Sequence, residues 1–175
     1  MLLKKMSNNL KKNILTLFGI GNIKFAPGTY ASLFTCFFFC ILIILKINLI
    51  IALFFLLILI PYSVFLINSN LNFFREIDAK EIVIDEFIGQ SIPLFFGYFF
   101  IDKISNFNVN IDKLFLIKFL IITFLTFRFF DIIKPYPINL IDKIKNGYGV
   151  VLDDVFAGIY SSIVVYLIFN YKILQ

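Results

Sequence analysis

Five apolar segments separated by short polar stretches constrain the fold of this chain more than any other feature. They run from about Thr29 to Leu45, Asn48 to Ile67, Phe87 to Ile101, Leu114 to Phe130 and Asp154 to Asn170. Several are shorter than the roughly 20 residues that a membrane-spanning helix needs, and the third is interrupted by Gly89, Gln90 and Pro93. We therefore expect an all-α fold, a polytopic helical membrane protein with four to five apolar helices in a single domain.

The composition supports a membrane protein over a soluble one. Hydrophobic residues make up 61% of the 175 positions and charged residues 15%, whereas a soluble domain has about 25% charged residues. The alternative, a soluble helical protein with a very large core, fits poorly with apolar runs this long. The net charge of +5 comes from lysines in tails and loops, so we read it as a topology signal and expect no nucleic-acid binding.

The distribution of Lys and Arg predicts an inward N-terminus. If all five segments cross, most cations then lie on the cytoplasmic side, as the positive-inside rule requires. The same arrangement places every polar cluster described below on the cytoplasmic face. We therefore expect one active site there, in a multi-pass membrane protein.

The stretch from Phe127 to Gly158 carries the densest group of charged residues next to apolar segments. Arg128, Asp131 and Lys134 are spaced i, i+3 and i+6 along one helical stripe, and Pro135 and Pro137 should end that helix. We expect Gly147 and Gly149 to loosen the backbone before Asp153 and Asp154, which open the last apolar segment. Such charges at a membrane boundary are costly and indicate function, here a metal and a phosphate. The three carboxylates also have simpler interpretations. Asp131 could be an ion-pair partner only, and Asp153 and Asp154 could be acids that a helix N-terminus favours.

A second acidic group precedes the third apolar segment. Asp85 and Glu86 stand at its edge, where clustered carboxylates need cations or a metal to offset their repulsion. The chain has no His, so oxygen ligands alone favour a hard cation such as Mg²⁺. For the nearby Asp78 and Glu81 we favour a solvated charged loop.

A third candidate lies before the first apolar segment. Pro27 and Gly28 predict a turn, Thr29 is a natural N-cap, and Ser32 follows three residues later. A helix start with free amides and hydroxyls suits a phosphate, although an ordinary capped helix would have the same sequence.

Four stretches resemble, in order, the signatures of one family. They are GIGNIKFAPGTYASL, IVIDEFIGQ, FRFFDIIKPYPI and GYGVVLDDVFAG, spanning Gly19 to Gly158. This set is similar to the bacterial phosphatidylglycerophosphatase A family of membrane lipid phosphatases, with departures at Lys24, Ala31 and Asn146. The resemblance implies hydrolysis of phosphatidylglycerophosphate to phosphatidylglycerol and inorganic phosphate, in phospholipid biosynthesis.

The residue types present exclude some classes of phosphatase mechanism. Without His, a histidine nucleophile or acid is excluded, and neither Cys36 nor Cys40 is followed by the Arg of a cysteine phosphatase loop. We hypothesise a Mg²⁺-dependent phosphatase acting on a phospholipid, with no inferable protein partner. The candidate catalytic residues are Asp85, Glu86, Asp131, Asp153 and Asp154; the candidate metal ligands are Asp85, Glu86, Asp153 and Asp154; and the candidate phosphate-binding residues are Thr29, Ser32, Arg128 and Lys134. An aspartate nucleophile and a metal-bound water both stay open.

Two other functions fit some of these features. A small membrane cation transporter could use the boundary carboxylates as an ion site, but it would not need Arg128 and Lys134 beside them. A non-enzymatic membrane scaffold could use the charges for helix assembly alone.

Overall fold

The structure, a computed structural model, describes residues 2–69, 79–100 and 113–170, and within these ranges the regular elements are helices. In chain order they are α1 (Leu2–Leu15), the short 3₁₀ helix η1 (Ile20–Asn22), α2 (Pro27–Ile44), α3 (Leu49–Ser69), α4 (Ile84–Phe100), α6 (Lys113–Ile133), α7 (Ile138–Ile141) and α8 (Gly147–Asn170). The expected all-α fold is confirmed for these residues. Asp78 and the predicted segment end at Ile101 lie outside the described residues.

Helix α8 begins earlier than the sequence predicts. Its first residue is Gly147, so Asp153 and Asp154 lie nearly two turns inside the helix and do not open it. The cause is Asn146, whose side-chain oxygen accepts hydrogen bonds from the backbone amides of Tyr148 (2.9 Å) and Gly149 (3.1 Å) and so caps the first turn. The prediction that Gly147 and Gly149 loosen the backbone is wrong, because both are helical.

The start of α2 also differs from the prediction. Ala26, in the left-handed region at φ 47°, is the N-cap residue, and Pro27 is the first residue of the helix. A proline at this position loses no helical hydrogen bond, because the first amides of a helix have no partner inside it. Thr29 therefore lies within the first turn, its amide donating to the Ala26 carbonyl (3.0 Å), and is not the N-cap.

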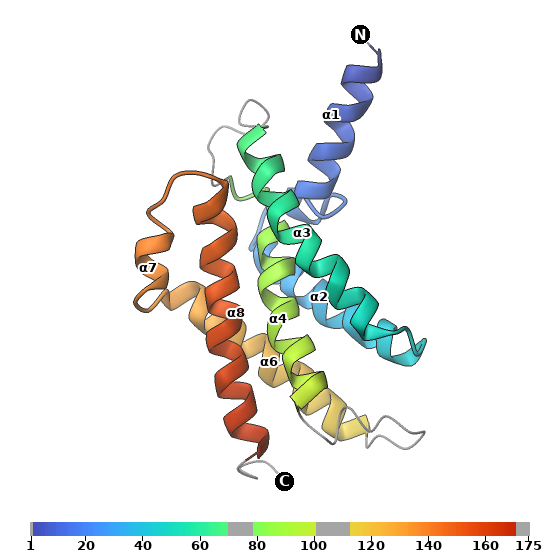
Figure 1. Cartoon of the computed structure of the whole chain (residues 1–175), viewed down its shortest axis with the longest axis vertical. Coiled ribbons are helices and arrows are strands. Elements are labelled where there is room, and N and C mark those ends of the chain that lie inside the picture. Colours follow the sequence, from blue (N-terminus) through green and yellow to red (C-terminus); the bar gives the residue numbers. More distant parts are fainter. Residues whose placement is uncertain (1, 70–78, 101–112, 171–175) are drawn as a thin grey trace.

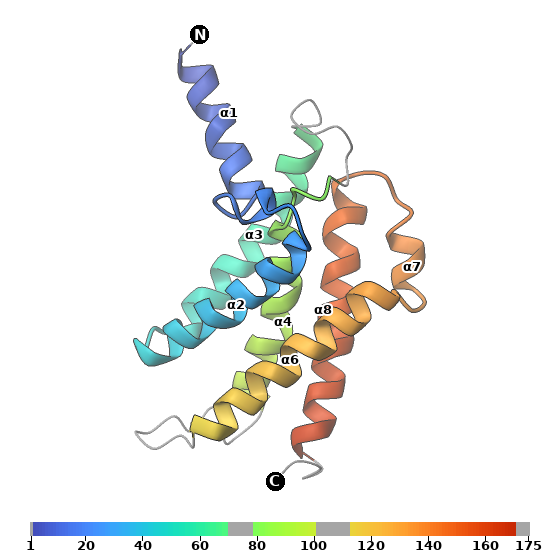
Figure 2. The same ribbon diagram turned by 180° about the vertical axis from the view of Figure 1, so that it is seen from behind.

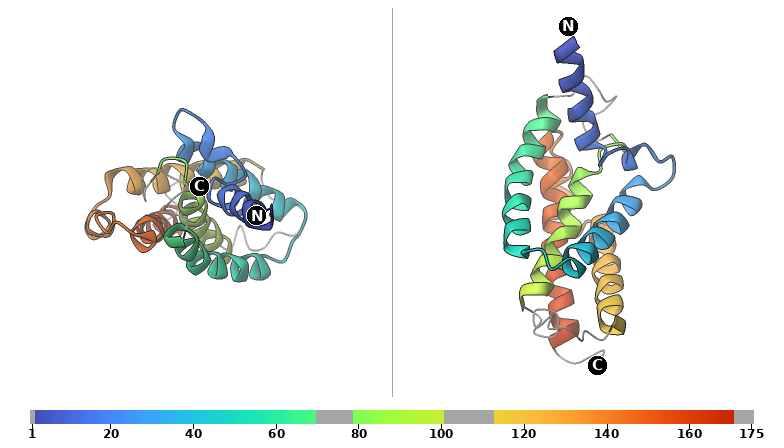
Figure 3. Two further views of the ribbon diagram at one scale, coloured as in Figure 1. Left: turned by 90° about the horizontal axis from the view of Figure 1, so that it is seen from above. Right: turned by 90° about the vertical axis from the view of Figure 1, so that its right-hand side faces the viewer.

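Helix α4 is the centre of the bundle (Figure 1). It packs most extensively against α8 and also contacts α2, α3 and α6. From behind, α6 crosses α4 and α8, and α2 lies on the same side of α4, in contact with α6 (Figure 2). The two views of Figure 3 show α3 on one flank of this group and α1 projecting beyond it. The first turns of α2 and α4 lie at the same end of the bundle.

Glycines allow the close approach of α4 and α8. A Cβ atom at Gly158 would collide with the Gly89 carbonyl oxygen and lie 3.0 Å from Cβ of Ile92. A Cβ atom at Gly89 would lie 2.7 Å from the Asp154 carbonyl oxygen. Small residues let helix backbones approach closely inside membranes. The hydroxyls of Thr126 and Ser161, 2.6 Å apart, add a contact between α6 and α8.

Among the described residues, α2, α3 and α8 are long and apolar enough to cross a membrane. Large apolar side chains on their outer faces, such as Phe37, Phe54 and Ile163, are exposed in the isolated chain, as expected for helices surrounded by lipid. The chain is thus a helical membrane protein. Helix α4 has 17 residues, and α6 carries Lys118, Arg128 and Asp131, so four or five crossings remain a prediction.

The glycine contact between α4 and α8 can be tested by Gly158→Val. The added side chain must push against Ile92 and the α4 backbone, so we expect the free energy of unfolding to fall by about 1–3 kcal/mol. Circular dichroism melting in detergent measures it. Ile159→Val, one residue further on a partly exposed side, is the control. Equal melting temperatures for the two variants would contradict the close approach.

Candidate active site

Three carboxylates from two helices meet at one place, which we call the carboxylate cluster. Asp85 and Glu86 lie in the first turn of α4, and Asp154 lies in α8. One oxygen from each lies within 4.8 Å of the others. Asp85 and Asp154 are buried, with 7% and 4% of their surface exposed. The contact of Gly89 with the Asp154 backbone holds the two helices at this distance.

Helix α6 brings an arginine to the same place. Nη1 of Arg128 lies 2.5 Å from Oδ2 of Asp131, one helical turn further along. A Cβ atom at Gly28, in the first turn of α2, would collide with Oε1 of Glu86 and lie 3.3 Å from Nη1 of Arg128. Gly28, Glu86 and Arg128 are therefore neighbours, and three of the four sequence signatures meet at this contact.

Lys134 forms a second set of charged contacts, with Asp142 and Asp153, next to the cluster. It lies directly after α6 at φ 47°, outside the right-handed helical region, which the following Pro135 disfavours. Its Nζ donates to Oδ2 of Asp153 (2.7 Å) and also to Oδ1 of Asp142. Burial lowers the pKa of Lys134, but the hydrogen bonds to Asp142 and Asp153 outweigh it and raise the pKa above its ordinary value. The ammonium group is therefore charged at neutral pH.

The structure separates the predicted site residues into three groups. Asp85, Glu86 and Asp154 form the carboxylate cluster, with Arg128 and Asp131 beside it. Asp153 binds Lys134, and its Oδ1 accepts a hydrogen bond from the Asp154 amide (2.9 Å), so the two acids have different partners. Near Gly28, Thr29 is half-buried, and the buried Ser32 hydroxyl donates to the Gly28 carbonyl (3.0 Å). Glu81 is exposed, as its interpretation as a loop residue requires.

Two residues near the site were missed by the sequence analysis. Gln90 is fully buried, and neither its amide nitrogen nor its amide oxygen has a hydrogen-bond partner among the described residues. It lies one helical turn after Glu86 on the same face of α4, so a polar side chain inside an apolar segment was the signal that could have found it. No such signal marks Asp142, because it lies eight positions after Lys134, beyond a proline turn.

The carboxylate cluster fits a hard divalent cation. Oδ1 of Asp85 and Oε2 of Glu86 are buried and have no hydrogen-bond partner among the described residues. A buried carboxylate oxygen without a partner is costly, and three carboxylates this close also repel one another. Oxygen ligands of this kind are those that Mg²⁺ uses in proteins. The arginine beside them adds a group that suits phosphate.

The fold and the site define a helical membrane protein with a buried centre of carboxylates and arginine. The family model described as Phosphatidylglycerophosphatase A matches residues 13–169, so the chain belongs to this family. A Haemophilus influenzae protein named phosphatidylglycerophosphatase A is 37% identical over 172 residues, covering 95% of this chain and 93% of the relative. A Bacteroides thetaiotaomicron protein named putative phosphatidylinositol-3-phosphatase is 30% identical, covering 86% of this chain and 87% of the relative. No solved structure matches the chain.

The contact between Gly28 and Glu86 can be tested by a double-mutant cycle. In an open helix, Gly→Ala stabilises by about 0.5–1 kcal/mol, but here the methyl group must displace the Glu86 carboxylate. We therefore expect Gly28→Ala to lower the melting temperature in the natural protein and to raise it in a Glu86→Ala background. Melting in detergent measures all four proteins. Additive effects of the two substitutions would show that residues 28 and 86 are not in contact.

Proposed function

We propose that this chain hydrolyses phosphatidylglycerophosphate to phosphatidylglycerol and inorganic phosphate, a reaction of phospholipid biosynthesis. The observation that carries the proposal is the meeting of charged groups from α4, α6 and α8 beside the first turn of α2. Carboxylates for a cation and a guanidinium for a phosphate are what hydrolysis of a phosphomonoester needs. The family and the Haemophilus influenzae relative support the same reaction.

We assign Mg²⁺ to the carboxylate cluster, with Asp85, Glu86 and Asp154 as its ligands. When bound, the ion offsets the charge of the phosphate and lowers the pKa of a coordinated water. Asp153, also expected as a ligand, accepts a hydrogen bond from Lys134, so we assign it no contact with the metal; its hydrogen bond from the Asp154 amide also helps to hold Asp154 in place.

Arg128 is the proposed phosphate clamp. Its Nε and Nη1 are both buried without a hydrogen-bond partner among the described residues, and Nη1 forms an ion pair with Asp131. A guanidinium oriented in this way can donate to two phosphate oxygens at once. Lys134 adds a fixed positive charge close by, and Thr29 and Ser32 place the first turn of α2 beside the phosphate. The Gln90 amide, which can donate and accept, would serve a phosphate oxygen or a headgroup hydroxyl.

The reaction replaces one bond to phosphorus by another. An oxygen of a water molecule or of an aspartate forms the new bond, the bond between phosphorus and the glycerol oxygen breaks, and the leaving oxygen takes up a proton. An aspartate attack would need a second step in which water releases the phosphate. Asp131 and Asp153 are the carboxylates proposed to move protons, because each lies against a cationic neighbour: Asp131 forms an ion pair with Arg128, and Asp153 accepts a hydrogen bond from Lys134.

We place this site on the cytoplasmic face of a bacterial inner membrane, in a multi-pass protein. The proposal rests on the excess of Lys and Arg in the segments expected to lie inside. A cation transporter, the alternative considered above, has no support from the comparisons, and it leaves the contact of Arg128 with the cluster without a purpose.

Phosphate release by the purified protein in detergent tests the function. We expect release from phosphatidylglycerophosphate, its loss on addition of a chelator, and its return with excess Mg²⁺. Phosphatidylinositol 3-phosphate, named for the Bacteroides thetaiotaomicron relative, is the comparison substrate. Phosphate release that persists in the chelator would contradict the metal assignment. Faster release from phosphatidylinositol 3-phosphate than from phosphatidylglycerophosphate would contradict the proposed substrate.

Asp154→Asn tests the carboxylate cluster within this reaction. Loss of one buried charge from the cluster should lower kcat by about 100-fold or more, with the protein still folded. Glu81→Gln is the matched control, since it removes an exposed carboxylate near the start of α4. Full turnover by a folded Asp154→Asn protein would remove Asp154 from the catalytic residues.

A further inference from the structure

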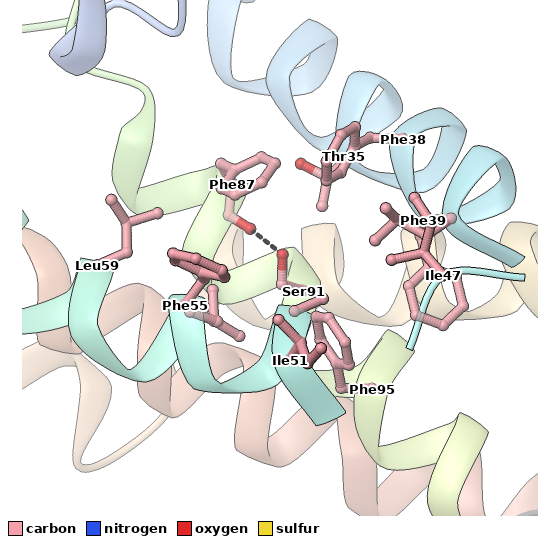
Figure 4. A pocket seen from close by; sticks show the side chains of 13 residues that line it. Thr35, Phe38, Phe39, Ile47, Ile51, Phe55, Leu59, Phe87, Ser91 and Phe95 are labelled. Carbon is pink, nitrogen blue, oxygen red and sulfur yellow. Dashed lines mark hydrogen bonds between the residues drawn. The ribbon is translucent and has the colours of Figure 1, made fainter. Parts of the chain in front are cut away.

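A cavity of about 420 Å³ lies between α2, α3 and α4, and we call it the α2–α3–α4 groove (Figure 4). Its walls include Phe39 from α2, Ala52 and Phe55 from α3, and Phe95 from α4. Two hydroxyls also line it, but Thr35 donates to the Ala31 carbonyl (2.8 Å) and Ser91 to the Phe87 carbonyl (2.7 Å). Both hydroxyls are thus satisfied within their own helices, and the groove offers an occupant an apolar surface.

The groove lies along the same two helices, α2 and α4, whose first turns stand at the carboxylate cluster. On α2, the lining residues Thr35, Phe39 and Leu42 continue the stripe that starts at Gly28, which touches Glu86 and Arg128. On α4, the groove starts at Phe87, the residue after Glu86, and ends at Phe95. With a rise of 1.5 Å per residue, this part of α4 is about 12 Å long. That length approaches the roughly 15 Å of one hydrocarbon leaflet.

One side of the groove is open. Ile47, in the turn between α2 and α3, lines the end that is far from the cluster. Along the side, Ile51 and Phe55 line the groove while more than half of each side chain is exposed. Because α2 and α3 are long and apolar enough to cross a membrane, this side faces lipid. A chain of a lipid could therefore enter sideways without passing through water.

We propose that the α2–α3–α4 groove binds one acyl chain of the phospholipid substrate while the phosphate lies at the carboxylate cluster. The proposal rests on the phospholipid phosphatase function given above. We assign it the substrate's own chain because α2 and α4 carry both the headgroup site and the groove, and the groove residue Phe87 directly follows Glu86 of the carboxylate cluster. Because the chain moves into the groove from an equally apolar lipid phase, its binding relies on packing against the groove walls, and a long chain makes more of these contacts than a short one.

Ala52→Phe tests the groove by filling it. The measurement is kcat/KM for two phosphatidylglycerophosphates in the same detergent, one with oleoyl and one with hexanoyl chains. We expect the ratio of long-chain to short-chain kcat/KM to fall about tenfold, because a short chain does not reach the filled part. Leu57→Phe, on an exposed position of α3 outside the groove, is the control and should keep the natural ratio. An unchanged ratio for Ala52→Phe would overturn the proposal.

A second measurement does not depend on turnover. Phosphatidylglycerophosphate with a diazirine near the end of one acyl chain is crosslinked to the natural protein, and the labelled peptides are identified by mass spectrometry. We expect labelling concentrated on Phe39–Leu42, Ile51–Phe55 and Ser91–Phe95, and reduced by Ala52→Phe. Labelling spread evenly over the exposed faces of α3 and α8 would overturn the groove. Absence of hydrolysis together with this focused labelling would instead reject the proposed function and keep the binding site.

Discussion

The burial of three carboxylates within an apolar helix bundle is the constraint on which the rest of this structure depends. Transferring an ionised carboxylate out of water costs several kcal/mol, and placing Asp85, Glu86 and Asp154 within 4.8 Å adds mutual repulsion. A bundle of helices does not tolerate this unless positive charge is nearby. Arg128 supplies one such charge, and a divalent cation bound by the three carboxylates would supply the other. The cluster is thus both an electrostatically costly part of the fold and the part best suited to bind phosphate.

Glycines at the helix contacts allow the charged side chains to come this close together. Gly89 and Gly158 bring the backbones of α4 and α8 into contact, which places Asp154 opposite the first turn of α4. Gly28 leaves room for the Glu86 carboxylate between α2 and α6. Lys134 then links the end of α6 to α8 through Asp153 and to Asp142 after α7. The polar groups are therefore held by helix packing on one side and by an ion-pair network on the other.

Much of this arrangement could be predicted from the sequence, because apolar runs and charge spacing are local properties. The helices lie close to the five apolar segments, and α6 ends just before the predicted proline turn. Other features depend on contacts that cannot be predicted from the spacing of residues in the sequence. The Asn146 side chain extends α8 toward its N-terminus, and the left-handed Ala26 displaces Thr29 from the N-cap position. Asp153 and Asp154 point about 100° apart on any helix, so the sequence indicates that their partners differ. Only the structure shows that Asp153 binds Lys134 and that Asp154 belongs to the carboxylate cluster.

Binding of Mn²⁺, a paramagnetic substitute for Mg²⁺, tests most directly whether the buried carboxylates form one cation site. Electron paramagnetic resonance on the protein in detergent would compare the natural chain with Asp85→Asn, Asp154→Asn and Glu81→Gln. We expect one bound ion in the natural chain and in Glu81→Gln, and its loss when either Asp85 or Asp154 is changed, although these residues belong to different helices. Undiminished Mn²⁺ binding in both of those variants would contradict this expectation.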